Sequence, residues 1–473
     1  MSFSNQSNVP QLLRIGSRIA VLPVIHGSGQ FALTVRSWML EESFDCVAIP
    51  LPASFRDPVE EAVLELPRPS IVIQPPMPRF FSADTGGDWT PSEWNESHEE
   101  DDDESEVPVS YVPIDPCQPV VMSIRAALGE HIAREYIDLE TDPFCPYATV
   151  MPDPFAVRHV SPERFAAALL PSIIRPPDPQ STARIRHMAA RLSALEARYQ
   201  RILLVCSVLH WPWIREAYTQ QLAAASRNNL SGDPGEDPPE ELPEHDLVQS
   251  PVRYAVNPKT LMFLFGELPF ITALYERARS EIEEDADLQV DGVKELLIAA
   301  RDRYSKALGN RARRVTPLLL SKCLQYIRNL SLIHRRMTPD LITIVIASKQ
   351  ILGDQFALHV AELANEYSYA IHAQEQDELQ SVSLGIDQAT LPDGETVSLV
   401  SRLPGPPLTW RTCQLQRRPT DFERDKWKYR WNPYSQCSYP PEDDRIETFR
   451  TRVFDRAKAI VGNDLAQTEK FTT

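Results

Sequence analysis

The sequence lacks the marks of several common protein classes. No apolar run reaches the ~18 residues that a membrane-spanning helix needs, and the polar segment Met1–Gln11 has no basic and then apolar stretch of the kind that directs secretion. The seven cysteines are scattered and include no Cys-x-x-Cys pair, which favours reduced thiols over a disulfide framework or a zinc ribbon. These absences predict a soluble, cytoplasmic protein with no membrane partner.

Basic charge is also scarce, with 66 acidic against 48 basic residues. The excess lies in two segments, because residues 84–106 hold 11 acids, residues 233–246 hold 7, and neither has a lysine or arginine. Both segments have little apolar content, so we predict that residues 82–106 and 231–246 are disordered acidic insertions outside the packed core. A chain without a basic face is not expected to bind nucleic acid.

One short stretch runs against this balance. Lys426–Trp431 alternates three basic with three aromatic side chains, and such a pattern can stack on nucleobases. In an acidic chain we favour the simpler interpretation, a half-buried edge strand with one basic and one aromatic face.

The familiar catalytic motifs are missing as well. The chain has no phosphate-binding loop of the Gly-x-x-x-x-Gly-Lys type and no Gly-x-Gly-x-x-Gly dinucleotide fingerprint. It also has neither the His-Glu-x-x-His motif of zinc proteases nor the Gly-x-Ser-x-Gly motif of serine hydrolases.

What the sequence does contain is a series of short apolar runs that alternate with helical patterns. The near-continuous apolar run Ile202–Val208 is typical of a strand buried on both faces of a parallel sheet. Further strands are expected at Arg18–Ile25, Phe44–Ile49, Ser70–Gln74, Val107–Pro113 and Arg134–Leu139, and helices at Phe31–Glu42, Gln118–His131, Ser181–Tyr199 and Trp213–Ala225. The alternation predicts an α/β core over residues 12–256, with a mostly parallel sheet flanked by helices.

After this core the pattern becomes helical. Residues 257–380 are predicted to form an added α-helical region, with helices at Leu261–Tyr275, Val293–Leu308, Leu318–Ile333 and Leu341–Tyr369. Residues 381–473 are predicted to form a small C-terminal α+β subdomain. Its expected parts are strands Ser381–Ile386 and Thr396–Leu403 around an Asp393-Gly394 turn, a strand at Leu408–Leu415, and a helix at Asp444–Val461.

Polar residues stand where several of the predicted core strands end. His26, Asp115, Asp138 and His210 follow or close strands, and Arg125 lies in the helix after Asp115. Parallel strands of one sheet bring their carboxyl ends to a common edge, so these five side chains are candidates for one catalytic cleft. Imidazoles and carboxylates suit acid–base chemistry or a divalent metal, for which His26 and His210 are the predicted ligands.

Each of these residues also has a structural interpretation that the sequence leaves open. A histidine after a strand is often only a loop or capping residue, and Asp115, between two prolines, can simply cap the next helix. Asp138 can hold a loop, and Arg125 can pair with a carboxylate for stability alone.

The order of these motifs resembles a known superfamily. His26-Gly27-Ser28-Gly29, Pro113–Pro116, Tyr136–Leu139 and the apolar strand that ends before His210 resemble the group of TraB/Tiki, ChaN-type haem-binding and erythromycin-esterase-like proteins. The resemblance covers about residues 18–225 and implies an α/β fold, with His26 and His210 at the two motif histidines. The sequence departs from the pattern in four places. Pro23 and Ser207 replace the motif glycines, Ile49–Pro52 stands where the family tends to place an acid, and Arg184–Met188 lacks the usual glutamate.

Two functions follow as hypotheses. The first is a divergent hydrolase-like domain that acts on a small molecule or peptide by metal-dependent or histidine-based hydrolysis, with His26 and His210 as base and acid, Asp115 or Asp138 orienting an imidazole, and Arg125 holding an anionic group. The second is a catalytically degenerate scaffold that binds a protein partner through the helical region. Whether the chain is an enzyme stays open at this point.

Overall fold

The computed structural model describes residues 11–77, 108–147, 149, 151–231, 244–281, 291–334, 336–373 and 379–406. The predicted insertion at residues 82–106 lies outside these ranges, as does most of the one at residues 231–246. Also outside them are the predicted strand Leu408–Leu415, the Lys426–Trp431 stretch and the helix Asp444–Val461.

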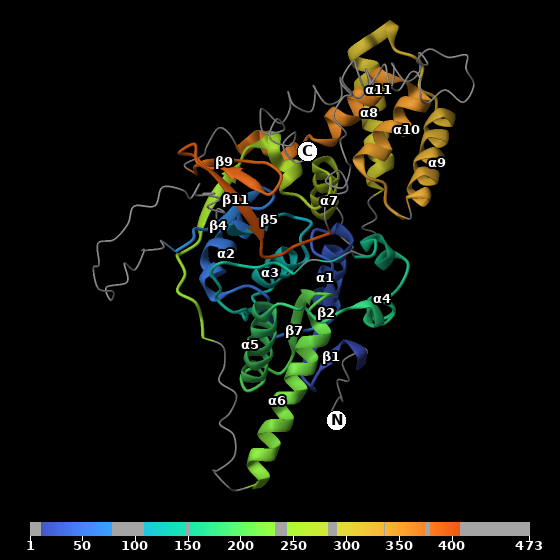
Figure 1. The fold of residues 1–473 in the computed structure, drawn as a ribbon. Helices are drawn as coiled ribbons and strands as arrows, with labels where there is room; N and C mark the ends of the chain where they lie inside the picture. The colour runs from blue at the N-terminus through green and yellow to red at the C-terminus, as the bar shows by residue number, and fades with distance from the viewer. Residues whose placement is uncertain are drawn as a thin grey trace, which may run out of the picture.

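A five-stranded sheet forms the centre of the molecule (Figure 1). Its order is β1 (Arg14–Ile15), β2 (Ile19–Val24), β7 (Ile202–Ser207), β3 (Cys46–Ile49) and β6 (Ala133–Tyr136). Strands β2, β7, β3 and β6 are parallel, and only the short β1 is antiparallel to its neighbour. Every residue of β2, β7 and β3 is buried, so the mostly parallel sheet expected from their apolar runs is confirmed.

Helices pack around this sheet in pairs. Helix α1 (Gly29–Glu41) packs against α3 (Pro119–Gly129), α5 (Pro179–Leu195) packs against α6 (Trp211–Ser231), and α2 (Arg56–Leu64) also contacts α3. Side-chain caps fix two of the starts, because Ser28 accepts a hydrogen bond from the α1 backbone and Asp178 accepts one from that of α5. Within the described ranges no helix is both long and apolar enough to cross a membrane.

A second sheet closes into a six-stranded barrel, which was not expected from the sequence. Its order is β10 (Gln388–Thr390), β11 (Thr396–Ser401), β5 (Val109–Ile114), β4 (Ser70–Gln74), β8 (Val252–Val256) and β9 (Ser381–Leu384). The prediction that β4 and β5 belong to the parallel sheet was wrong, since they are antiparallel to each other and lie in the barrel. The cause is that both faces of β4 are buried: Ile71 and Ile73 face the barrel core while Val72 packs in the core of the parallel sheet. Such a strand has the same apolar pattern as one in the middle of a parallel sheet.

The predicted Asp393-Gly394 turn is present, and it joins β10 to β11. Gly394 has a φ of 91°, a backbone conformation that glycine adopts without strain. Strand β9 pairs with β10 and with β8, and β11 pairs with β5. Strands from residues 381–406 therefore complete a barrel begun far earlier in the chain, and in Figure 1 they lie beside β4 and β5.

The helical region has its own apolar core. It contains α7 (Pro269–Glu281), α8 (Gly292–Leu308), α9 (Pro317–Ile333), α10 (Leu341–Leu352) and α11 (Asp354–Ala364), and the last four project as a bundle in Figure 1. The expected single helix Leu341–Tyr369 is broken at Gly353, whose φ is 95°. The expected helix Leu261–Tyr275 is a 3₁₀ segment, η5 (Pro258–Phe263), followed by α7.

The remaining short elements connect these layers. They are α4 (Pro162–Leu169) and the 3₁₀ segments η1 (Gln11–Leu13), η2 (Ala53–Phe55), η3 (Pro154–Arg158), η4 (Leu170–Ser172), η7 (Gly309–Arg311) and η8 (Ser368–Ala373).

Two glycines bring the start of the helical region onto the edge of the parallel sheet. Gly27, in the turn after β2, has a φ of 71°, and Gly266, just before α7, lies directly against it. A Cβ atom at Gly266 would lie 2.0 Å from the carbonyl oxygen of Gly27. Backbone therefore meets backbone at this point, which leaves no room for a side chain.

We expect Gly266→Ala to destabilise the fold by about 3 kcal/mol, because the added methyl group must push two backbone segments apart. Urea unfolding of the full chain would measure the loss. Gly129→Ala is the matched control, since a Cβ there has nothing within 4 Å, and it should leave stability unchanged or slightly raised. Equal stability of the two variants would contradict the close contact.

Candidate functional site

The two predicted histidines lie at one edge of the parallel sheet. His26 follows β2 and His210 follows β7, and these strands are hydrogen-bonded parallel neighbours with Val24 opposite Ser207. Both histidines line one small pocket, hereafter the strand-end pocket, together with Phe144, Tyr147, Arg184 and Arg402. The pocket has a volume of about 10 Å³, which is room for about one water molecule.

His26 is held by an amide. Its ring is 3% exposed, and Nδ1 lies 3.1 Å from Oε1 of Gln118, which also accepts a bond from the backbone N–H of Gly27 at 3.4 Å. Because an amide oxygen only accepts, the imidazole proton sits on Nδ1 and Nε2 is left with its lone pair. Burial lowers the pKa of His26 to about 4, so the ring is neutral at neutral pH.

His210 begins the turn into α6 and is also kept neutral. Its Nε2 atom is buried and has no hydrogen-bond partner among the described residues. Burial lowers the pKa of His210 to about 3, and the nearby positive charge of Arg184 adds to the effect. The ring stacks on Tyr147 with centroids 6.4 Å apart.

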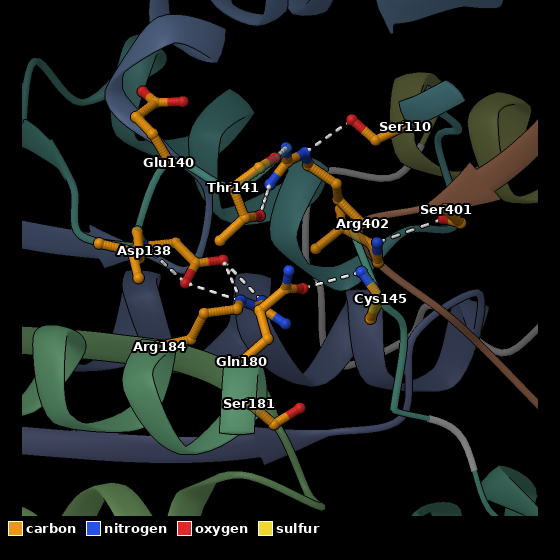
Figure 2. Close-up of polar contacts among 12 residues, drawn as sticks. Ser110, Asp138, Glu140, Thr141, Cys145, Gln180, Ser181, Arg184, Ser401 and Arg402 are labelled. Atoms are coloured by element: carbon orange, nitrogen blue, oxygen red, sulfur yellow. Dashed lines mark hydrogen bonds and ion pairs between the residues drawn. The ribbon is translucent and has the colours of Figure 1, made fainter. Parts of the chain in front are cut away.

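Asp138 does not orient an imidazole, as the sequence had suggested, but forms a buried ion pair. Its two carboxylate oxygens accept three hydrogen bonds from Arg184, at 3.0, 3.1 and 2.6 Å (Figure 2). Both residues are about 3% exposed. The carboxylate of Asp138 therefore neutralises the buried charge of Arg184.

Arg402 is the second arginine of the strand-end pocket, and no motif in the sequence pointed to it. It follows β11 and is 2% exposed, and it donates to Ser110, Gln74 and Thr141 at 2.7–3.4 Å. Figure 2 shows its bonds to Ser110 and Thr141. None of these acceptors is a carboxylate. Burial lowers the pKa of Arg402 only to about 10, so the guanidinium remains charged at neutral pH.

Arg402 also begins a strap, residues 402–406, that covers the pocket. Leu403 and Pro404 line the pocket, and a Cβ at Gly405 would lie 2.7 Å from the carbonyl oxygen of His26. Phe144 packs under both cations, with Cζ of Arg402 4.7 Å and Cζ of Arg184 4.8 Å from its ring centroid. The barrel thus supplies one wall of a pocket at the edge of the parallel sheet.

Asp115 and Arg125 do not line this pocket. Asp115 caps a turn, since its carboxylate accepts from the backbone N–H groups of Cys117 at 2.8 Å and Gly266 at 2.9 Å, and burial raises its pKa to about 6. Arg125 forms a two-pronged ion pair with Glu276 of α7 at 2.7 and 3.2 Å. Both residues join the start of the helical region to the core, which is the structural role that the sequence left open for them.

A divalent metal does not fit the strand-end pocket. His26 and His210 offer two neutral imidazoles, but the described residues contain no group of three or more His, Cys, Asp or Glu side chains placed to hold an ion. The carboxylate of Asp138 is occupied by Arg184, and two guanidinium groups would repel a cation. Catalytic metal sites usually have three protein ligands, and the side chains that line this pocket do not supply them.

The sequence found both histidines but missed their neighbours. Only Gln118 could have been identified from the sequence, because it stands at the start of a predicted helix. In the structure this helix start lies beside the turn that contains His26. Arg184 was noted only as a departure from the family pattern. Arg402 lies 192 positions after His210 and reaches the pocket only through the unpredicted barrel.

Comparison of the chain with protein-family models, with curated proteins and with solved structures found no match.

The buried Asp138–Arg184 pair provides a test of the site's electrostatics. We expect Asp138→Asn to cost about 3 kcal/mol in unfolding free energy, because it leaves a guanidinium buried without its counter-charge. The double variant Asp138→Leu/Arg184→Met should be more stable than Asp138→Asn, since it removes both charges.

The control is Glu216→Gln, which breaks an ion pair with Arg175 whose side chains are 50% and 40% exposed. Exposed pairs of this kind contribute about 1 kcal/mol or less. An Asp138→Asn loss as small as that of the control would show that Arg184 is not desolvated.

The depressed histidine pKa values predict acid sensitivity. Between pH 6.5 and about pH 4 the unfolded chain binds a proton at His26 that the folded chain does not, so stability falls as the pH falls through this window. We expect His26→Gln to remove about 3 kcal/mol of this pH dependence, measured by urea unfolding at steps across the window. His334→Gln, at an exposed histidine, should unfold with the wild-type pH dependence, and the same result for His26→Gln would show that its imidazole is not held neutral.

Proposed function

We propose that the chain is a hydrolase-like α/β protein that recognises a small anionic group in the strand-end pocket without hydrolysing it. The observation that carries the proposal is Arg402, a charged side chain with 2% exposure and no carboxylate acceptor among the described residues. Asp138, Glu140 and Asp142 lie near enough to raise the pKa of Arg402, but none of them accepts a hydrogen bond from it. A buried guanidinium that bonds only to neutral acceptors is costly, and an anion from solution offsets part of that cost. His210, whose buried Nε2 has no hydrogen-bond partner among the described residues, lines the same pocket.

The histidines support binding rather than catalysis. A general base works best with a pKa near the operating pH, whereas burial lowers the pKa of His26 to about 4 and that of His210 to about 3. Asp138 is paired with Arg184, and although its charge raises the pKa of His210, burial and the charge of Arg184 outweigh that effect. The pair of neutral imidazoles therefore lines the pocket as a polar wall.

The size of the pocket limits the ligand. A volume of about 10 Å³ admits a halide ion or the tip of a carboxylate, and a phosphate group would have to displace the strap at residues 402–406. What these ligands have in common is one anionic atom that accepts hydrogen bonds from guanidinium N–H groups.

Histidine-based hydrolysis is the second candidate, and one observation favours it. The pocket has room for one water molecule, His210 lines it, and the Nε2 of His210 has no hydrogen-bond partner among the described residues, as a general base requires. The partner surface predicted for residues 257–380 remains a prediction of the scaffold hypothesis.

Anion binding can be tested on the full chain by thermal unfolding in chloride, formate, acetate and phosphate, with sodium methanesulfonate keeping the ionic strength constant. We expect chloride or formate to raise the unfolding free energy by about 1.4 kcal/mol at ten times its Kd. Arg402→Gln should abolish this response, and Arg301→Gln, at a half-buried arginine paired with Asp302 outside the pocket, should keep it.

The outcomes separate the hypotheses. A response to chloride alone identifies a monatomic anion, whereas a response to formate and acetate identifies a carboxylate ligand. No anion response, or the same response in Arg402→Gln, overturns the proposal. Hydrolysis of p-nitrophenyl acetate that persists in a chelator and is lost in His210→Gln establishes the catalytic candidate in its place.

A further inference from the structure

A second and much larger cavity lies at one end of the barrel. Its volume is about 700 Å³, within the range of roughly 300–1,000 Å³ that is usual for small-ligand sites. Its apolar lining comes from four barrel strands and the turn after β10, and includes Ile73, Val109, Tyr254, Leu391 and Val397. We call this cavity the barrel mouth.

These five side chains belong to the inward face of the barrel. Side chains along a strand alternate between faces, and Ile73 lies in the barrel core while Val72 packs on the opposite side of the same strand. All five residues lie in the barrel core or pack directly against it. The barrel mouth is therefore an opening of the barrel interior, a place where closed barrels commonly bind ligands.

The rim of the barrel mouth carries negative charge. Asp142, Asp246 and Glu395 line it, and no lysine or arginine among the described residues does. One oxygen of Asp142 accepts from the N–H of Met77 at 2.8 Å, and one of Asp246 accepts from the N–H of Asp142 at 3.1 Å. Each carboxylate accepts several hydrogen bonds, so capacity remains on both, and Glu395 is exposed.

We infer that the barrel mouth binds a small organic cation, an amine joined to an aromatic or aliphatic body. The apolar body is buried against Tyr254, Leu391 and Val397, and the ammonium group lies among the rim carboxylates. The aromatic face of Tyr254 adds a favourable contact for a cation. This site differs from the strand-end pocket in its residues and in the sign of its charge, and it does not depend on the function proposed there.

The test uses three ligands of matched shape on the full-length protein: 1-naphthylmethylamine, 1-naphthalenemethanol and 1-naphthoate. Isothermal titration calorimetry at low salt should show the tightest binding for the amine, weaker binding for the alcohol and the weakest for the carboxylate. Glu395→Gln should weaken amine binding about two- to fivefold, the range that one solvent-exposed ion pair supports, and leave alcohol binding unchanged. Added salt should weaken amine binding in the same way.

Two further variants complete the design. Glu61→Gln removes an exposed carboxylate from α2, outside the barrel mouth, and should bind the amine like the wild type. Val397→Trp fills the cavity and should abolish binding of both amine and alcohol while the far-ultraviolet circular dichroism stays unchanged.

Equal binding of all three ligands, no binding of the amine, or an unchanged affinity in Glu395→Gln would each overturn the inference.

Discussion

The parallel pairing of β2 with β7 is the constraint on which the rest of the site depends. Both strands are buried on both faces, so each of their backbone N–H and C=O groups must be satisfied within the sheet. In this pair Val24 lies opposite Ser207, so the residues that follow the two strands lie at the same edge of the sheet. A slip of one residue would turn every side chain of β7 to the other face, so the packing of two helical layers fixes where His26 and His210 stand.

How much could be read from the sequence follows from this constraint. Continuous apolar runs before His26 and His210 identify fully buried strands, and adjacent parallel strands share an edge, so local pattern was enough to bring the two histidines together. The sequence also predicted that Asp138 lies near that edge, but it did not predict Arg184 as its partner. Arg184 lies on a helix, and the spacing of apolar residues does not define how that helix is rotated about its axis. The prediction that Asp115 shares this edge was wrong for another reason. Asp115 follows a strand of the barrel, and the burial of a strand does not show to which sheet it belongs.

The barrel is the part of the fold that sequence patterns could not supply. Its strands come from residues 70–114, 252–256 and 381–401, and the pairs β8–β9 and β5–β11 join segments separated by the whole helical region. Turn chemistry predicted the local Asp393-Gly394 connection, where a positive φ favours glycine. Long-range parallel pairing leaves no such local mark, which is why Arg402 could not be connected with hydrogen-bond partners that precede it by 261 to 328 positions.

Residues 141–144 contribute to both the strand-end pocket and the barrel mouth, which differ in the sign of their charge. Thr141 accepts hydrogen bonds from Arg402, and Phe144 packs beneath both arginines, on the side of the strand-end pocket. Between them, Asp142 and Pro143 line the barrel mouth. The segment bends at Asp142 and Pro143, so Thr141 and Phe144 contact the cations while the carboxylate of Asp142 lines the acidic rim. Positive charge is thereby buried at the edge of the parallel sheet while negative charge collects at the open end of the barrel.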